Sequence, residues 1–300
     1  MIPDVDMASP SASISPGASI FTSAPAFAAF NLVRPAGEAG RYVFASPHSG
    51  MERPSDFGAS PDIGHVALGG GEDRFVDRLV AAGPAHGAPV ISGRVSRAYL
   101  DLNRDPAELD PALIDDCPPA DLSAKTLAGF GVIPRRGGDG MDLYDRRLSF
   151  SEARTRIERL HRPYHATLAD LMTQTRTRHG TAVLIDWHSM PSRAAGGTER
   201  SAPGPDVVLG DRFGAACDPG LTRRLRLLFE QVGWRVGLNA PYAGGYTTQA
   251  WGRPAEGFQA VQIELNRALY LNEATLEPSA DFARCQAVMD RVVASVCSQE

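Results

Sequence analysis

The sequence has 300 residues, of which 43% are hydrophobic, and its formal net charge at pH 7 is −5. A chain of this length can bury a sizeable core as one large domain, or as two at most. Its mild acidic excess gives no electrostatic reason to expect nucleic acid or an anionic membrane as a partner.

The cysteines and the N-terminal region indicate which kinds of site and targeting segment to expect. The four cysteines form no CxxC pair, which argues against a cysteine-based zinc site or a disulfide framework and suits a reducing cytoplasm. No run of about 18 apolar residues predicts a membrane span. The N-terminal region is rich in Ser, Ala and Pro and lacks the pattern of a signal peptide. We therefore predict a disordered tail over residues 1–36 and a single catalytic α/β domain over residues 37–300.

The first predicted strand is Tyr42–Ala45, and it runs directly into the segment SPHSG. Pro47 and Gly50 bracket His48 in a tight turn, which would fix its imidazole at the end of the strand. A Gly/Pro-rich loop follows, and then Glu72–Val80 predicts an amphipathic helix. The acidic first turn of that helix, with Glu72 and Asp73, would by itself be explained by charge stabilisation of the positive helix end.

Ala88–Gly93 and Arg97–Leu102 supply further predicted strand material, followed by Asn103 and Arg104. An Asn-Arg pair suits a carboxylate ligand, because the guanidinium binds both oxygens while the amide donates a third hydrogen bond. The alternative is a salt bridge within the protein, for which Asp101 and Asp105 are available.

The next part of the chain, Asp105–Phe150, is a long connection rich in Pro and Gly, as in lids and substrate loops. A helix is predicted from Ser151 to Arg178, in which Pro163 would introduce a kink or divide it in two. After it comes TAVLIDWHSMP, in which Ala182–Asp186 reads as a buried strand and His188 follows its end.

A single histidine at a strand end can simply hydrogen-bond its neighbours. Three other stretches end in the same way, however: YVFASPH, AYLDLNR and AVQIELNR all run from an apolar strand into ionisable groups. Because open α/β sheets bind ligands at the ends of their strands, we expect these four segments to meet at one cleft.

Predicted strands and helices continue to alternate in the C-terminal third of the chain. We predict a loop over residues 191–219, a helix at Leu221–Val232 and strands at Arg235–Leu238 and Ala260–Leu265, the last containing Glu264. Between the strands, PYAGGYTT is a glycine-hinged loop whose tyrosines could close over a substrate. A helix is predicted at Phe282–Val296, and the whole pattern is that of a three-layer α/β domain without a nucleotide-binding glycine motif.

Two histidines on different strands and one carboxylate are the minimum set for a catalytic zinc site with a position left open for water. A further glutamate could take a proton from that water, and an arginine could stabilise the oxyanion. Read in this way, the sequence predicts a metal amidohydrolase acting on an acidic or amino-acid-like substrate. No HExxH motif is present to settle the question.

Six motifs, in their order along the chain, resemble the N-formylglutamate amidohydrolase family: SPHSG, SRAYLDLNR, HRPYHATL, DWHSMP, PYAGGYTT and QIELNRALY. They cover nearly everything from about Arg41 to Tyr270. The family is distantly similar to zinc carboxypeptidases and aspartoacylases. The resemblance therefore implies a three-layer α/β/α sandwich around a mixed sheet, phosphorylase/hydrolase-like and zinc carboxypeptidase-like, with a single zinc ion.

The resemblance also implies the metal ligands. His48 and His188 correspond to two zinc-binding histidines. Zinc carboxypeptidases place a glutamate three residues after the first histidine, where this sequence has Met51. Asp73 stands where the acidic residue of the resembled family precedes SRxxxDLNR, so the resemblance implies Asp73 as the preferred third ligand, with Glu72 and Glu52 as its substitutes.

The remaining implied roles concern the substrate. Glu264 resembles the general base and Arg97 the oxyanion-stabilising arginine. Asn103 and Arg104 resemble the anchor of the substrate carboxylate, and Tyr246 resembles a mobile tyrosine that covers the substrate. Asp186 and Ser189 are candidates to orient His188.

The implied reaction is the zinc-dependent hydrolysis of N-formyl-L-glutamate to formate and L-glutamate, the last step of one histidine-degradation route. The expected cofactor is Zn²⁺, with another divalent metal possible in its place, and the expected partner is a small acidic N-acyl amino acid. Two alternatives stay open. One is a different N-acyl-amino-acid deacylase or a peptidoglycan-type amidase on the same scaffold, and the other is a metal-free binding protein.

Overall fold

The computed structural model describes residues 28–194 and 204–298. Its centre is a seven-stranded sheet with the strand order β1-β3-β2-β6-β9-β7-β8. The neighbouring strands β3, β2, β6 and β9 are parallel, whereas β1 and β7 run antiparallel to β3 and β9, so the sheet is mixed as predicted. The strands are β1 (Phe30–Val33), β2 (Tyr42–Ser46), β3 (Val90–Gly93), β6 (Ala182–Met190), β7 (Val207–Gly210), β8 (Val236–Leu238) and β9 (Phe258–Asn266).

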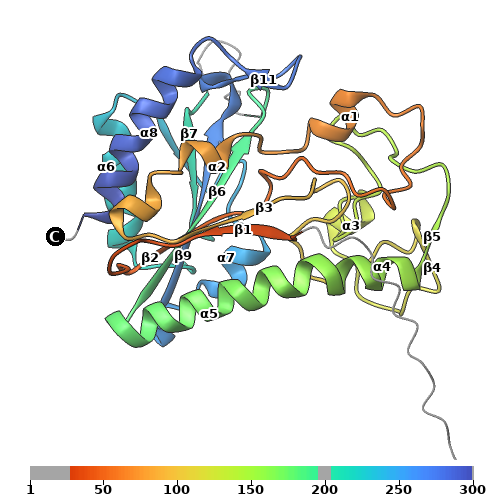
Figure 1. Ribbon diagram of the computed structural model, residues 1–300, viewed down its shortest axis with the longest axis horizontal. Helices are drawn as coiled ribbons and strands as arrows, with labels where there is room; N and C mark the ends of the chain where they lie inside the picture. The colour runs from red at the N-terminus through yellow and green to blue at the C-terminus, as the bar shows by residue number, and fades with distance from the viewer. Residues whose placement is uncertain (1–27, 195–203, 299–300) are drawn as a thin grey trace, which may run out of the picture.

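Helices cover both faces of this sheet, which confirms the three-layer prediction (Figure 1). One face carries α5 (Arg162–His179) and α7 (Tyr246–Trp251), and the other carries α2 (Val76–Leu79), α6 (Pro219–Gln231) and α8 (Phe282–Cys297). Among the described residues, none of the helices is both long enough and apolar enough to cross a membrane.

The other elements are short and lie mostly beyond one end of the sheet (Figure 1). The helices among them are α1 (His65–Gly69), α3 (Ala124–Leu127) and α4 (Phe150–Arg156), and 3-10 turns cover Gly83–His86, Pro254–Glu256 and Arg267–Leu269. Two small sheets are formed by β4 (Ile114–Asp115) with β5 (Leu148–Ser149), and by β10 (Leu271–Asn272) with β11 (Glu277–Pro278).

The alternation of side chains along β6 places the candidate site. Ala182 and Leu184 belong to the core on the α5 side of the sheet, whereas Val183 and Ile185 belong to the core on the α6 and α8 side. Since successive residues of a strand point to opposite faces, Asp186 and His188 continue the α5 face towards the carboxyl end of the strand. In the neighbouring strand β9, Gln262 and Glu264 stand directly beside them in the register.

The predicted helix from Ser151 to Arg178 is neither divided nor sharply bent at Pro163. Instead, α4 leads into α5 through a π-helical turn, Ile157–His161, in which the Arg162 amide donates to the Ile157 carbonyl. Proline lacks an amide hydrogen and crowds the carbonyl four residues earlier, and one wider turn relieves both problems.

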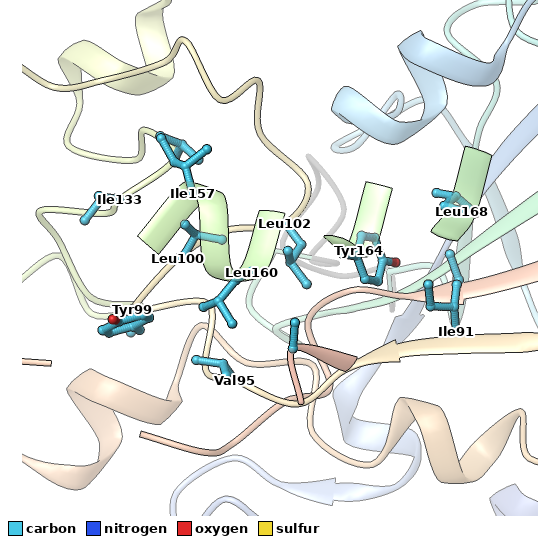
Figure 2. Close-up of a cluster of buried hydrophobic side chains, with 14 of the residues drawn as sticks. Ile91, Val95, Tyr99, Leu100, Leu102, Ile133, Ile157, Leu160, Tyr164 and Leu168 are labelled. Carbon is cyan, nitrogen blue, oxygen red and sulfur yellow. The ribbon is translucent and has the colours of Figure 1, made fainter. Parts of the chain in front are cut away.

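The connection over residues 105–150 contributes apolar side chains to the core on the α5 side of the sheet. Figure 2 shows Ile157 and Leu160 of the π turn packed among Tyr99, Leu100 and Ile133, and this cluster continues along α5 to Tyr164 and Leu168. The segment is therefore anchored to the main core, although the sequence shows little periodicity there.

Several element boundaries differ from the prediction. Arg97–Leu102 forms turns, not a strand, and the helix expected at Glu72–Val80 begins only at Val76. The strand β6 continues through His188 to Met190, and β7 lies in the region predicted as loop. In the region predicted as a disordered tail, β1 pairs with β3; residues 1–27 lie outside the described part of the chain.

Candidate metal centre and active site

A cavity of about 580 Å³ lies at the carboxyl end of the central strands. Two histidines and three carboxylates line it, together with several basic side chains. The ionisable and amide residues of its wall are His48, Asp73, Arg97, Asp101, Asn103, Arg104, Lys125, Arg136, His188, Gln262, Glu264 and Arg267.

Three residues distant in the sequence converge in this cavity. His48 follows β2, Asp73 precedes α2, and His188 lies within β6. The two imidazole centroids are 4.7 Å apart, and Asp73 Oδ2 lies 3.0 Å from His188 Nδ1 and 3.4 Å from His48 Nδ1. The side chains of these three residues each offer one ligand atom within 4.8 Å of the others, an arrangement that can hold a metal ion. The expected convergence of the two histidines is thus present.

Each imidazole has a carboxylate on its other nitrogen. His48 Nε2 lies 2.6 Å from Asp101 Oδ1, and His188 Nε2 lies 3.1 Å from Asp186 Oδ2. When Nε2 donates its hydrogen to the carboxylate, the lone pair of Nδ1 is free to bind a metal. Within the described residues, His48 Nδ1 is buried without a hydrogen-bond partner, so its surroundings fit a cation there. Two nitrogens and one carboxylate oxygen also match the ligand set of catalytic zinc.

The second carboxylate oxygen of Asp73, Oδ1, accepts hydrogen bonds that fix the side chain. Ser189 Oγ and an Arg267 guanidinium nitrogen each donate to Asp73 Oδ1 at 3.0 Å, and the Asp73 amide donates to the His48 carbonyl at 2.9 Å. Burial by itself would raise the pKa of Asp73, but the neighbouring imidazoles of His188 and His48 hold it well below its usual range. The carboxylate is therefore charged, as a metal ligand must be.

Glu72 and Glu52, the two alternatives to Asp73, form ion pairs with other residues. Glu72 is buried, accepts hydrogen bonds from Arg74 Nε and Ser96 Oγ, and does not face the histidines. Glu52 is exposed and pairs with Arg94. Ser189, expected to orient His188, instead orients Asp73.

Glu264 stands beside His188 in the β6–β9 register. Gln262 holds it: Gln262 Nε2 donates to Glu264 Oε1 at 2.7 Å, while Gln262 Oε1 accepts from the Gly245 amide at 2.8 Å. Burial raises the pKa of Glu264, although the neighbouring His188 opposes this effect. A buried carboxyl with a raised pKa next to a candidate metal centre is suited to proton transfer.

The segment 97–104 connects the metal centre with the basic wall of the cavity. Asp101 Oδ1 contacts His48, and its Oδ2 accepts hydrogen bonds from Arg97 at 2.5 and 3.2 Å. Asn103 Oδ1 accepts from the Thr247 amide, and Asn103 Nδ2 lies 3.1 Å from His188 Nε2. Asn103 is therefore occupied within the protein.

The sequence model of the N-formylglutamate amidohydrolase family matches residues 40–271. The chain belongs to this family. An N-formylglutamate deformylase of Pseudomonas putida is 34% identical to it over 190 residues, which are 62% of this chain and 66% of that protein. An N-formylglutamate deformylase of Pseudomonas aeruginosa is 31% identical over 204 residues, which are 67% of this chain and 71% of that protein.

Solved structures agree with this membership. A crystal structure of an N-formylglutamate amidohydrolase from Ralstonia eutropha JMP134 superposes with a TM-score of 0.84 at 36% identity, covering 90% of this chain and 98% of that one. A gene product of Agrobacterium tumefaciens has a TM-score of 0.55 at 18% identity, covering 90% of this chain and 96% of that one, and shares the fold alone.

Within this N-formylglutamate amidohydrolase fold, one expected site residue is not at the cavity. The ring of Tyr246, the first residue of α7, packs against His161 and His165, with centroids 5.8 and 5.3 Å away, whereas Tyr242, in the loop before α7, lines the cavity. In the sequence, both Tyr242 and Tyr246 flank the glycines of PYAGGYTT, so only tertiary packing shows which of them reaches the cavity.

Sequence reasoning also missed three partners of the site. Asp101 was considered only as a salt-bridge partner, and Gln262 and Arg267 were not singled out. The sequence contained signals for Gln262 and Arg267. Gln262 lies two residues before Glu264 and so on the same face of the strand, and Arg267 is the last residue of the stretch AVQIELNR.

Proposed function

We propose that this protein is a zinc-dependent amidohydrolase that cleaves N-formyl-L-glutamate to formate and L-glutamate. One observation carries the proposal: His48, Asp73 and His188 converge at a cavity where Glu264 stands beside His188. Family membership and the printed names of the two Pseudomonas relatives support the choice of substrate. The place in histidine degradation is part of the same proposal.

His48, Asp73 and His188 would hold the metal ion. A divalent cation bound there would supply Lewis acidity towards water and towards the formyl carbonyl. Asp101 and Asp186 would keep both imidazoles oriented with Nδ1 available, and Ser189 and Arg267 would fix the Asp73 carboxylate.

Glu264 is the proposed general base. It accepts a proton from the attacking water and returns that proton to the nitrogen of the breaking C–N bond, so that the amine of glutamate can leave. The hydrogen bond from Gln262 fixes its Oε1 during both transfers. Water supplies the oxygen that appears in formate, and the two products account for all atoms of substrate and water.

Arg97 and Arg104 are the proposed cationic groups for the substrate. Arg97 is held by Asp101 at the cavity wall, where it would stabilise the negative charge that develops on the formyl oxygen. Arg104 would bind a substrate carboxylate. Because Asn103 is already hydrogen-bonded, we assign it to positioning Asp186, the partner of His188, since Asn103 Nδ2 donates to Asp186 Oδ2 at 3.4 Å. Tyr242 replaces Tyr246 as the tyrosine facing the substrate.

The test compares substrates on the purified protein after incubation with zinc. Glutamate release from N-formyl-L-glutamate, without comparable cleavage of N-acetyl-L-aspartate or short peptides, is the expected result. If the protein does not cleave N-formyl-L-glutamate but cleaves another amide, the proposed substrate is wrong. Elemental analysis of the same sample tests the metal separately, with close to one zinc per chain expected.

A further inference from the structure

The outer wall of the cavity carries positive charge that the protein does not neutralise. On the inner side, Asp101 is paired with Arg97, and Asp73 is paired with Arg267. Arg104 has only a distant ion pair, with Glu108 at 3.7 Å, and its Nε is buried without a hydrogen-bond partner among the described residues. These contacts leave part of the cationic wall available to an anionic ligand.

Lys125 is the second available cation. It lies on the short helix α3, which the Ser123 side chain caps at the Thr126 amide. Lys125 lines the cavity, and its ammonium group forms no hydrogen bond or ion pair with the side chains that the structure describes. Loss of hydration, and then the positive charges of Arg104 and Arg97, lower the pKa of Lys125. A bound anion would relieve this repulsion.

The two cations lie at different depths. The side chain of Arg104 is 13% exposed, whereas Lys125 is an exposed residue at the rim of the cavity. In an N-acyl glutamate, the α-carboxylate lies close to the scissile amide and the side-chain carboxylate lies farther from it. The deeper cation therefore suits the first carboxylate and the outer cation suits the second.

Resting on the proposed function, we propose that Lys125 is a specificity-determining residue that binds the side-chain carboxylate of the substrate. Arg104 binds the α-carboxylate, and the pair selects N-acyl amino acids that carry two carboxylates. Arg136 also lines the cavity, but it is exposed and already faces Asp142 at 3.4 Å.

The experiment measures binding without turnover. Calorimetry on the full chain loaded with zinc compares glutarate, a dicarboxylate, with its monoamide, which has the same length and one carboxylate. We expect wild-type protein to prefer glutarate by about fivefold to tenfold, the value of one charge-assisted contact at a partly exposed site. Lys125→Gln should remove most of this preference, and Lys125→Arg should restore it.

A matched control is Arg223→Gln, which removes one positive charge from an exposed position on α6, on the opposite face of the sheet. It should leave the preference for glutarate unchanged, and thermal unfolding should show all variants folded. A preference that survives Lys125→Gln would overturn the proposal, as would wild-type protein that binds both ligands equally or binds neither.

Hydrolysis of N-formyl-L-glutamate and N-formyl-L-glutamine separates this proposal from the function itself. If the wild type cleaves neither compound but binds glutarate through Lys125, the reaction is wrong and the carboxylate site stands. If the wild type prefers N-formyl-L-glutamate and Lys125→Gln keeps that preference, the reaction stands and the role of Lys125 is wrong.

Discussion

Asp101 contacts both the candidate metal centre and the cationic wall of the cavity. One of its oxygens contacts His48, and the other accepts hydrogen bonds from Arg97. Burial alone would raise the pKa of Asp101, but the charges of Arg97 and His48 keep it well below its ordinary range. This carboxylate therefore fixes the orientation of His48, a candidate metal ligand, and of the proposed oxyanion-binding group together.

Replacing Asp101 with Asn should weaken zinc binding by about 10-fold to 100-fold, because the neutral amide no longer fixes the His48 tautomer. Competition with a chromogenic chelator measures this affinity directly. Asp115→Asn provides the control, since Asp115 is exposed and pairs with Arg147 away from the cavity. Equal zinc affinity in the Asp101 variant and the wild type would remove Asp101 from this role.

Glu264→Gln separates proton transfer from metal binding. The amide oxygen of the new side chain can still accept the hydrogen bond from Gln262, so the site should keep its shape and its zinc. Because the amide cannot accept a proton, kcat should fall by about 100-fold or more. Elemental analysis and steady-state kinetics on the same preparation give both quantities. Full activity in this variant would exclude Glu264 as the base.

At the scale of secondary structure, regular apolar segments were predictable and the polar segments between them were not. The strands β2 and β9 and the helices α6 and α8 lie close to their predicted positions, because burial dictates their patterns. His188 was expected after a strand that ends at Asp186 and instead lies inside β6, because the cavity supplies polar partners there. A buried strand can carry ionisable residues when each of them is paired.

Long-range pairing explains why two strands of the central sheet, β1 and β7, were missed. β1 and β7 have four residues each, and both run antiparallel to partners remote in the sequence, β3 and β9. Segments this short carry no decisive periodicity of their own. The three residues of the candidate metal centre were proposed from residue type and family resemblance, and the structure places them together. The choice between Tyr242 and Tyr246 depended on packing against α5.

The helix α5 presents a histidine that should make the fold sensitive to acid. His165 is half-buried and donates from Nε2 to the Leu102 carbonyl at 2.8 Å, close to the Arg104 segment. Burial, and then the neighbouring His161, lower the pKa of His165 to about 3. Since the unfolded chain takes up this proton near pH 6.5, the stabilisation is complete above that pH and is lost as the pH falls towards 3.

Between pH 7 and pH 5, wild-type protein should lose about 1 kcal/mol more unfolding free energy than His165→Gln, after allowance for the partial exposure of the ring. The glutamine amide can still donate to Leu102 but does not titrate. Urea unfolding at the two pH values measures the difference. His86→Gln, at an exposed position, is the control, and identical pH dependence in wild type and His165→Gln would contradict the assignment.

At the scale of the whole molecule, the candidate ligands come from parts of the chain that are distant in the sequence and that the fold brings together. His48 follows β2, Asp73 lies in the loop before α2, and His188 is within β6, so that a bound cation would tie three segments together. An ion that binds only the folded chain stabilises it by mass action, by about 2.7 kcal/mol at a concentration 100 times its Kd. In a chain of this size, that corresponds to a rise in Tm of about 4 °C.

Zinc should therefore raise the Tm of the wild type, and His188→Ala should abolish the rise while also lowering the basal Tm through the lost contacts with Asp73 and Asp186. Differential scanning calorimetry with and without zinc measures both effects, and a chelator should reverse the first. His86→Ala keeps all three ligands and should retain the full shift. Because this readout needs no substrate, a zinc-dependent shift that persists in His188→Ala would show that zinc binds elsewhere, whatever reaction the protein catalyses.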